Sequence, residues 1–147
     1  MKVLLPAKID DRILRVCRRV MERPDADHSL DRLAALANLS PYYFLRLFKT
    51  TLKETPHRFV ARVRIEAAKN LLAGKERSVT EICFMVGFES LGSFSRLFHK
   101  ATGWTPSIYR ARAWEIEERP AKFIPGCYIH RFALAPHLER ASVADVD

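Results

Sequence analysis

One pattern of residues occurs twice along this 147-residue chain, and a repeat of this length restricts the fold to two copies of one small unit. The offset is forty-nine residues for the first of three matching segments and fifty for the other two, so the second copy has one extra residue in its turn. The three segments are Ser29-Leu30-x-x-Leu33-Ala34 with Ser78-Val79-x-x-Ile82-Cys83, Phe44-Leu45-Arg46-Leu47-Phe48 with Phe94-Ser95-Arg96-Leu97-Phe98, and Thr55-Pro56-x-x-Phe59 with Thr105-Pro106-x-x-Tyr109.

The first copy predicts a short helix, a turn and a second helix. Ser29 caps the short helix, Asn38 suits the turn, and Ser40-Pro41 opens a helix that runs to about Thr51. In the second copy Ser78 and Glu81 form a capping box, and Gly87 takes the place of Asn38. This arrangement, with an arginine on the outer face of the second helix, is typical of a helix-turn-helix unit.

Two further helices are predicted, one before the first unit and one between the two units. Residues 10–21 have apolar side chains at helical spacing, and residues 56–73 predict a longer helix that ends before Gly74. We expect its inward side to consist of Phe59, Val60, Val63, Ala67, Ala68, Leu71 and Leu72. The prediction is therefore all-α, with helix-turn-helix subdomains at 8–55 and 74–114, a linker helix at 56–73 and a C-terminal extension at 115–147 of unknown role.

The length of the linker helix bears on function. A helix of this length extends roughly 27 Å at about 1.5 Å per residue. The second helix of each unit is its recognition helix. Two recognition helices that enter successive major grooves must lie about 34 Å apart. The linker helix and the bodies of the two units together can separate the recognition helices by a distance of this order.

Charge favours a polyanionic partner. The chain carries a net charge of +8, and acidic residues outnumber basic ones only after residue 114. Double-stranded DNA is the leading candidate, although a basic surface can also serve solubility alone. The acidic extension, with a Pro-Gly turn and strand-like apolar content between Phe123 and Phe132, is expected to pack on the domain, and the alternative is that it presents a surface to a partner.

The sequence shows no motif for a disulfide framework, a metal site, a catalytic site or a membrane span. The three cysteines are odd in number and widely spaced, and no histidines occur as an i, i+4 pair, so we expect neither disulfides nor a metal or cofactor. No nucleophile elbow or glycine-rich phosphate loop is present, which argues against an enzyme. No apolar run approaches the length that spans a bilayer, and a cytoplasmic protein with no membrane partner is expected.

Residues from about Asp11 to Arg112 resemble the DNA-binding domain of the AraC/XylS transcriptional regulators. The matching motifs are Leu30-x-x-Leu33-Ala34, Ser40-Pro41-x-x-Phe44-x-Arg46-Leu47-Phe48, Arg64-Ile65-x-x-Ala68-x-x-Leu71-Leu72, and Val86-Gly87-Phe88-x-Ser90-x-x-Ser93-Phe94-Ser95-Arg96-Leu97-Phe98 followed by Thr102-Gly103-x-Thr105-Pro106-x-x-Tyr109-Arg110. The resemblance implies a seven-helix bipartite domain that binds duplex DNA and controls transcription. Since the first helix begins near residue 10, we expect a single-domain member.

The second helix of each unit supplies the candidates for base contact. Arg46 and Arg96 are equivalent, and an arginine there can donate two parallel hydrogen bonds to guanine, with a phosphate contact or an internal salt bridge as the alternative. Leu45 and Leu91 stand where family members often carry polar base-reading side chains, so apolar contact with thymine methyls and dependence on DNA shape are expected. The full set of predicted base-contacting residues is Tyr42, Leu45, Arg46, Leu91, Gly92, Ser95 and Arg96.

Hydroxyl groups at helix starts and basic side chains are the candidates for contact with the DNA backbone. Thr55-Pro56 and Thr105-Pro106 each open a helix with free amides that suit a phosphate, while plain capping is the alternative for both. The predicted backbone-contacting residues are Ser40, Lys49, Thr55, Ser90, Lys100, Thr105, Ser107 and Arg110, with Arg62 a weaker candidate.

One residue of the linker helix and one residue of the first unit are predicted to have structural roles. Arg64, on the linker helix, is expected to tie the two subdomains together. Lys53 stands where the family usually has glycine, so the turn after the first recognition helix is expected to be strained or rearranged.

Three functions remain open at this point. The first is a sequence-specific regulator that binds duplex DNA as a monomer, since two units already supply what other regulators gain by dimerising. The second is a protein-interaction module that recruits RNA polymerase or another regulator, with weak DNA specificity. The third is a ligand-gated regulator with a pocket under the extension. The sequence shows no group of polar residues that supports such a pocket.

Overall fold

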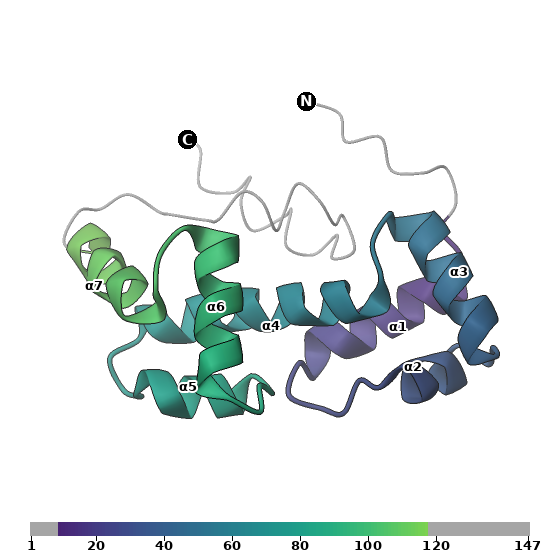
Figure 1. Cartoon of the computed structure of the whole chain (residues 1–147), viewed down its shortest axis with the longest axis horizontal. Helices are drawn as coiled ribbons and strands as arrows, with labels where there is room; N and C mark the ends of the chain where they lie inside the picture. The colour runs from purple at the N-terminus through teal and green to yellow at the C-terminus, as the bar shows by residue number, and fades with distance from the viewer. Residues whose placement is uncertain (1–8, 118–147) are drawn as a thin grey trace, which may run out of the picture.

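The repeat in the sequence becomes a repeat of helices. The computed structural model describes residues 9–117, which form helices and connecting loops and contain no strand (Figure 1). The helices are α1 (Asp11–Glu22), α2 (Leu30–Leu36), α3 (Pro41–Leu52), α4 (Pro56–Ala73), α5 (Val79–Met85), α6 (Leu91–Thr102) and α7 (Pro106–Glu117). The all-α prediction and the two helix-turn-helix units, α2–α3 and α5–α6, are confirmed. The strand-like segment predicted at 123–132 lies outside the described residues.

Two separate apolar cores stand side by side along α4. The first is formed by α1, α2, α3 and the N-terminal half of α4, and the second by the C-terminal half of α4 with α5 and α6, against which Tyr109 of α7 packs. Helix α4 contributes Phe59, Val60 and Val63 to the first core, and Ile65, Ala68 and Leu72 to the second. The linker is therefore a structural member of both units. Ala67 and Leu71, expected inside, are only partly buried, while Ile65 is fully enclosed.

The C-terminal half of α4 contributes buried apolar residues to the second unit, as α1 does to the first unit. Ile13, Val16 and Val20 of α1 are buried at the spacing repeated by Ile65, Ala68 and Leu72 of α4. The remaining inward position differs, since buried Cys17 of α1 corresponds to Lys69 of α4. Lys69 lies in this position because its ammonium group pairs with the Glu66 carboxylate at 2.6 Å.

Matching stacks of aromatic rings hold the two cores. Phe44, Phe48 and Phe59 form the first stack, with ring centroids 5.5 and 5.6 Å apart. The second stack contains Phe94, Phe98 and Tyr109, at 5.6 and 5.2 Å. Both end in an edge-to-face contact, which is a preferred geometry of aromatic pairs. Residues fifty positions apart in sequence therefore make equivalent ring contacts in the two cores.

The turn of each helix-turn-helix unit depends on one left-handed residue. Asn38 has φ 55° and Gly87 has φ 99°. After α2, Leu39 N–H donates to Ala34 O at 3.0 Å, and after α5, Phe88 N–H donates to Cys83 O at 3.1 Å. These bonds close the Schellman motif that ends a helix. Four residues separate α2 from α3 and five separate α5 from α6, so the predicted extra residue in the second turn is confirmed.

Lys53 also adopts the left-handed conformation, with φ 60°, at the end of α3. Gly103 occupies the same place after α6, with φ 80°. The turn is therefore strained and not rearranged, because a side chain at positive φ brings Cβ close to the carbonyl oxygen.

We expect Lys53→Gly to raise the free energy of unfolding by about 0.5–1 kcal/mol, because glycine removes the strain and the Lys53 side chain is exposed. Urea denaturation measures the change. Gly103→Ala is the matched reverse variant and should lower stability by about 1 kcal/mol. A loss of stability in Lys53→Gly would contradict the assignment of strain.

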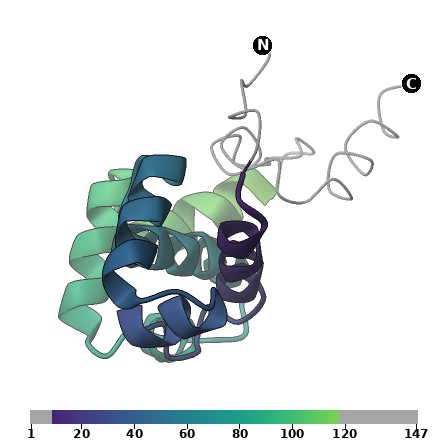
Figure 2. The ribbon, with the colours of Figure 1, turned by 90° about the vertical axis from the view of Figure 1, so that its right-hand side faces the viewer.

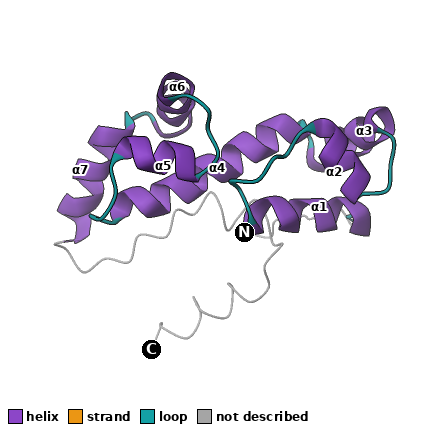
Figure 3. Cartoon of the chain, turned by 90° about the horizontal axis from the view of Figure 1, so that it is seen from below, coloured by secondary structure: helices purple, strands orange, loops and turns teal. Residues whose placement is uncertain are grey.

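The positions of the helices relative to α4 decide which surface can meet a ligand. Figure 2 shows α3 and α6 on one side of α4 and α1 on the other. The view from below agrees, with α4 lying between α6 and α1 (Figure 3). The two second helices thus share one side of the molecule, as binding to one face of a duplex requires.

Candidate nucleic-acid interface

Arg46 and Arg96 occupy equivalent exposed positions on α3 and α6. Each helix buries two phenylalanines against its core, Phe44 with Phe48 and Phe94 with Phe98. Because the arginine lies two residues after the first phenylalanine and two before the second, it must project from the opposite side of the helix. Within residues 9–117 the ion pairs involve neither arginine, so both guanidinium groups have their donors available.

Tyr42 is the most exposed aromatic residue on α3, with 71% of its surface accessible. The Arg46 guanidinium carbon lies 6.0 Å from the centre of its ring. A contact of this kind between residues i and i+4 orients a flexible arginine at modest cost in side-chain entropy. Tyr42 therefore orients the Arg46 side chain and also exposes its own hydroxyl group.

The other predicted base contacts differ in how far they are accessible. Leu91 is 40% exposed at the start of α6, and a Cβ added at Gly92 would meet nothing within 4 Å, so the N-terminal end of α6 is open. Leu45 and Ser95 are half-buried at matching positions. The N-terminal turn of α6 thus presents the Leu91 side chain beside open backbone at Gly92.

Hydroxyl groups predicted to contact DNA phosphates are already capping their helices. The hydroxyl oxygens of Ser40, Ser90, Thr55 and Thr105 accept hydrogen bonds from amides three residues ahead, at 3.4, 3.2, 3.3 and 3.4 Å respectively. Proline at the first position of α3, α4 and α7 removes one of the free amides. The amide at the second position remains for a phosphate, and Ser107 lies exposed at that position of α7.

The predicted basic contacts separate into exposed and internal groups. Lys49 and Lys100, near the C-terminal ends of α3 and α6, are exposed, and the ion pairs of the described segment leave both out. Arg110 is half-buried, donates from Nη2 to the carbonyl oxygen of Arg77, and lies 5.9 Å from the Trp114 ring. Arg110 therefore holds α7 to the loop before α5, a packing role that the sequence did not indicate.

Arg62 is also used inside the protein. Its guanidinium group pairs with the Glu54 carboxylate and lies 5.3 Å from the Phe59 ring. In the second unit the corresponding residues are Trp104 and Arg112, whose guanidinium carbon lies 3.7 Å from the ring centre. Both pairs fasten the loop after the recognition helix to the helix that follows, one by charge and one by cation–π contact.

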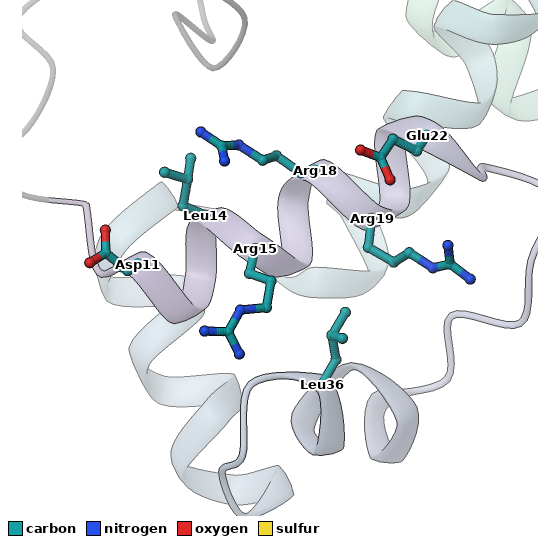
Figure 4. Close-up of a pocket in the computed structure, with 7 residues that line it drawn as sticks. All are labelled: Asp11, Leu14, Arg15, Arg18, Arg19, Glu22 and Leu36. Atoms are coloured by element: carbon teal, nitrogen blue, oxygen red, sulfur yellow. The ribbon is translucent and has the colours of Figure 1, made fainter.

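Two surface features are not indicated by the sequence pattern. Tyr43, beside Tyr42, is 50% exposed on α3. A groove between α1 and α2 is lined by Asp11, Leu14, Arg15, Arg18, Arg19, Glu22 and Leu36. In Figure 4, Arg15 and Arg19 flank Leu36, while Arg18 points away from it. Since α1 lies across α4 from α3 and α6, these arginines stand outside the surface shared by the recognition helices.

Burial and hydrogen bonds shift the pKa values of several groups among residues 9–117. Burial raises the pKa of Cys17 to about 12 and that of Cys83 above its usual value, so both thiols stay protonated and inert. Hydrogen bonds from Arg12 lower the pKa of Asp10, the cap of α1, to about 2. In the described part of the chain no group of three His, Cys, Asp or Glu residues could hold a metal, and no helix there is long and apolar enough to cross a membrane.

Two helix-turn-helix units that share α4, with their second helices on one side, define a bipartite helix-turn-helix domain. A family model described as a helix-turn-helix domain matches residues 33–112. The chain belongs to the AraC family of helix-turn-helix transcriptional regulators.

Similar curated proteins carry regulator names. The HTH-type transcriptional regulator MtrA of Neisseria gonorrhoeae is 31% identical over 101 residues, which cover 69% of this chain and 34% of MtrA. The MmsAB operon regulatory protein of Pseudomonas aeruginosa is 40% identical over 83 residues, covering 56% and 27%. The chain thus spans about a third of the length of the curated relatives it matches.

Solved structures of the same family share the fold. A probable AraC family transcriptional regulator from Rhodopseudomonas palustris has 26% identity and a TM-score of 0.65, covering 71% of this chain and 98% of its own. The DNA-binding domain of AdpA, a global transcriptional factor solved in complex with a target DNA, has 26% identity and a TM-score of 0.68, covering 77% and 100%.

Proposed function

We propose that this chain regulates transcription by binding duplex DNA with both units at once, α3 and α6 entering successive major grooves on one face of the duplex. The observation that carries the proposal is the placement of Arg46 and Arg96, exposed at equivalent positions on helices that lie on the same side of α4. A further support is the AdpA domain, which was solved with a target DNA and has the same fold.

The proposed base readers form two groups. Arg46 and Arg96 donate bidentate hydrogen bonds to guanine, and Tyr42 orients Arg46 while it meets a sugar or base edge. Leu91 and the bare N-terminal turn at Gly92 approach thymine methyls and follow groove shape, with Leu45 and Ser95 as minor contacts because both are half-buried.

The proposed backbone contacts are charges and helix N-termini. Lys49 and Lys100 neutralise phosphates beside the two recognition helices. The free amides at the starts of α3, α4, α6 and α7 receive phosphate oxygens, while Ser40, Ser90, Thr55 and Thr105 fix those turns by capping, and Ser107 adds a hydroxyl donor. Arg110 is left out of this set because its guanidinium is engaged with Arg77 and Trp114.

Selection of bound duplexes from a randomised pool, followed by footprinting, tests the proposal. The expected site is asymmetric, because the two units differ in sequence, and it covers about 20 base pairs with two informative segments one helical turn apart. We expect one copy of the chain per duplex, measured by mass. A palindromic site, a footprint confined to half a turn, or no selected sequence at all would each overturn it.

We expect Lys49→Ala to weaken binding to every duplex alike and to reduce by about 1 the slope of log affinity against log salt concentration, because one fewer counterion is released. Titrations at several salt concentrations, with selected and random duplexes, measure both effects. Arg15→Ala removes the same charge from the opposite side of the molecule and serves as the control. An equal change of slope in Arg15→Ala would remove Lys49 from the contact surface.

A further inference from the structure

Arg64 lies at the point of α4 where one core gives way to the other. The preceding residue, Val63, belongs to the first core, and the following residue, Ile65, belongs to the second. Its guanidinium group turns back toward the first unit, where Nε donates to the carbonyl oxygen of Pro24 at 2.8 Å and Nη2 donates to that of Ala26 at 3.0 Å. Both carbonyls are in the loop between α1 and α2, so Arg64 fixes the first unit to the middle of α4.

The same guanidinium group touches the second unit. A Cβ added at Gly87 would lie 2.9 Å from Nε of Arg64 and 3.0 Å from its Cζ. Gly87 is the left-handed residue of the turn between α5 and α6. The bare Cα of Gly87 therefore allows the guanidinium to pack directly on the turn that sets the direction of α6. One side chain thus contacts the loop before α2 and the turn before α6.

The surroundings suit an arginine and no shorter cation. Arg64 is half-buried, and the carboxylates of Asp25, Asp27 and Glu89 act on its charge from both units. Its planar fork delivers two hydrogen bonds in one fixed geometry, whereas a lysine ammonium is a point charge on a flexible stem. The bonded carbonyls are 40 and 38 residues away in sequence, so they constrain the tertiary arrangement and not the local helix.

We propose that Arg64 is a positioning residue that fixes α3 and α6 relative to each other and thereby sets the spacing of the two DNA segments the chain reads. The spacing role rests on the proposed function. Linked binding modules gain affinity only when their geometry matches both sites, so freedom between the units lowers the gain without altering either recognition helix. Arg64 acts through α3 and α6 and does not itself contact DNA.

The first test needs no DNA. Spin labels are placed at Thr50→Cys on α3 and Ala101→Cys on α6, both exposed, after Cys127→Ser, while buried Cys17 and Cys83 stay unlabelled. Pulsed electron paramagnetic resonance then measures the distance between labels. We expect one narrow distribution for the parent chain and for the charge control Arg15→Ala, and a broad or shifted one for Arg64→Ala. An unchanged distribution in folded Arg64→Ala would overturn the proposal.

The second test uses the duplex that the parent chain selects, together with duplexes holding one segment alone or the two segments separated by added base pairs. We expect Arg64→Ala to lose roughly tenfold or more in affinity for the full duplex and to keep its affinity for one segment, because only the linked gain is reduced. Added base pairs should penalise the parent chain more than the variant. Equal losses on full and single-segment duplexes would overturn the spacing role.

The two tests separate this inference from the proposed function. If the parent chain selects no duplex, the proposed function fails, and the label distances still decide whether Arg64 fixes the two helices. Far-UV circular dichroism shows whether Arg64→Ala is folded. If it is not, Arg64→Lys takes its place, since it keeps the charge and much of the stem and loses the fork. The same broadening is expected there, and an unchanged distribution would contradict the proposal.

Discussion

The double variant Arg46→Ala/Arg96→Ala is expected to bind the selected duplex about 2–6 kcal/mol more weakly than the parent chain, because each bidentate contact to guanine contributes about 1–3 kcal/mol. The two losses should add, since the arginines lie on separate helices attached to separate cores. This corresponds to an affinity lower by a factor of roughly 30 to 2 × 10⁴. Neither side chain belongs to a core, so the fold should be retained.

The single variants show whether both units read sequence. Arg46→Ala should relax preference in one segment of the site and Arg96→Ala in the other, while binding to random duplexes changes far less for either. Repeating the duplex selection with each variant measures this directly. If both variants lose as much on random as on selected duplexes, the arginines contact phosphates and the assignment to bases is wrong.

Phe98→Ala is expected to lower the free energy of unfolding by about 3–5 kcal/mol, as is usual when a buried phenylalanine is truncated and leaves a cavity. Phe98 is fully buried, with its ring centroid 5.6 Å from that of Phe94 and 5.2 Å from that of Tyr109. Since Tyr109 is the contact of α7 with this stack, the loss should loosen α7 as well. Such a change is a large part of the stability of a small domain.

Tryptophan fluorescence localises the effect. The chain has two tryptophans, Trp104 and Trp114, and both lie in the second unit, where Trp114 donates from Nε1 to the carbonyl oxygen of Ala73 at 3.2 Å. In urea, Phe98→Ala should move the fluorescence transition to lower concentration more than the matched variant Phe48→Ala does. Circular dichroism follows both units. Coincident transitions in the two variants, with equal shifts, would mean that α4 joins the cores into one cooperative unit.

The repeat determined most of the local structure. Hydrophobic spacing and capping residues predicted the helices and the two helix-turn-helix units, and the change of offset predicted the longer second turn. The capping box of Ser78 and Glu81 is present, with hydrogen bonds of 3.1 and 2.7 Å. These features were predictable because each depends on residues within a turn or two of one another.

The candidate site was predictable only in part. The repeat placed Arg46 and Arg96 at matching positions of two helices, and both proved to be exposed. The same pattern predicted Arg110 as a backbone contact and did not indicate that its guanidinium donates to the carbonyl oxygen of Arg77, 33 residues away in sequence. A basic residue on an outward position looks the same in sequence whether it meets solvent, a phosphate or a distant carbonyl.

The sequence by itself determined which residues form helices, which side of each helix is apolar, and that one unit occurs twice. Only the tertiary structure decided that α4 divides its apolar side between two cores and that Lys69 is buried where α1 has a cysteine. It also decided which segments Arg64 joins, namely the loop at Ala26 and the turn at Gly87. The physical reason is that helical periodicity depends on neighbours along the chain. The partner that covers each face depends on contacts between residues far apart in sequence, which the periodicity does not specify.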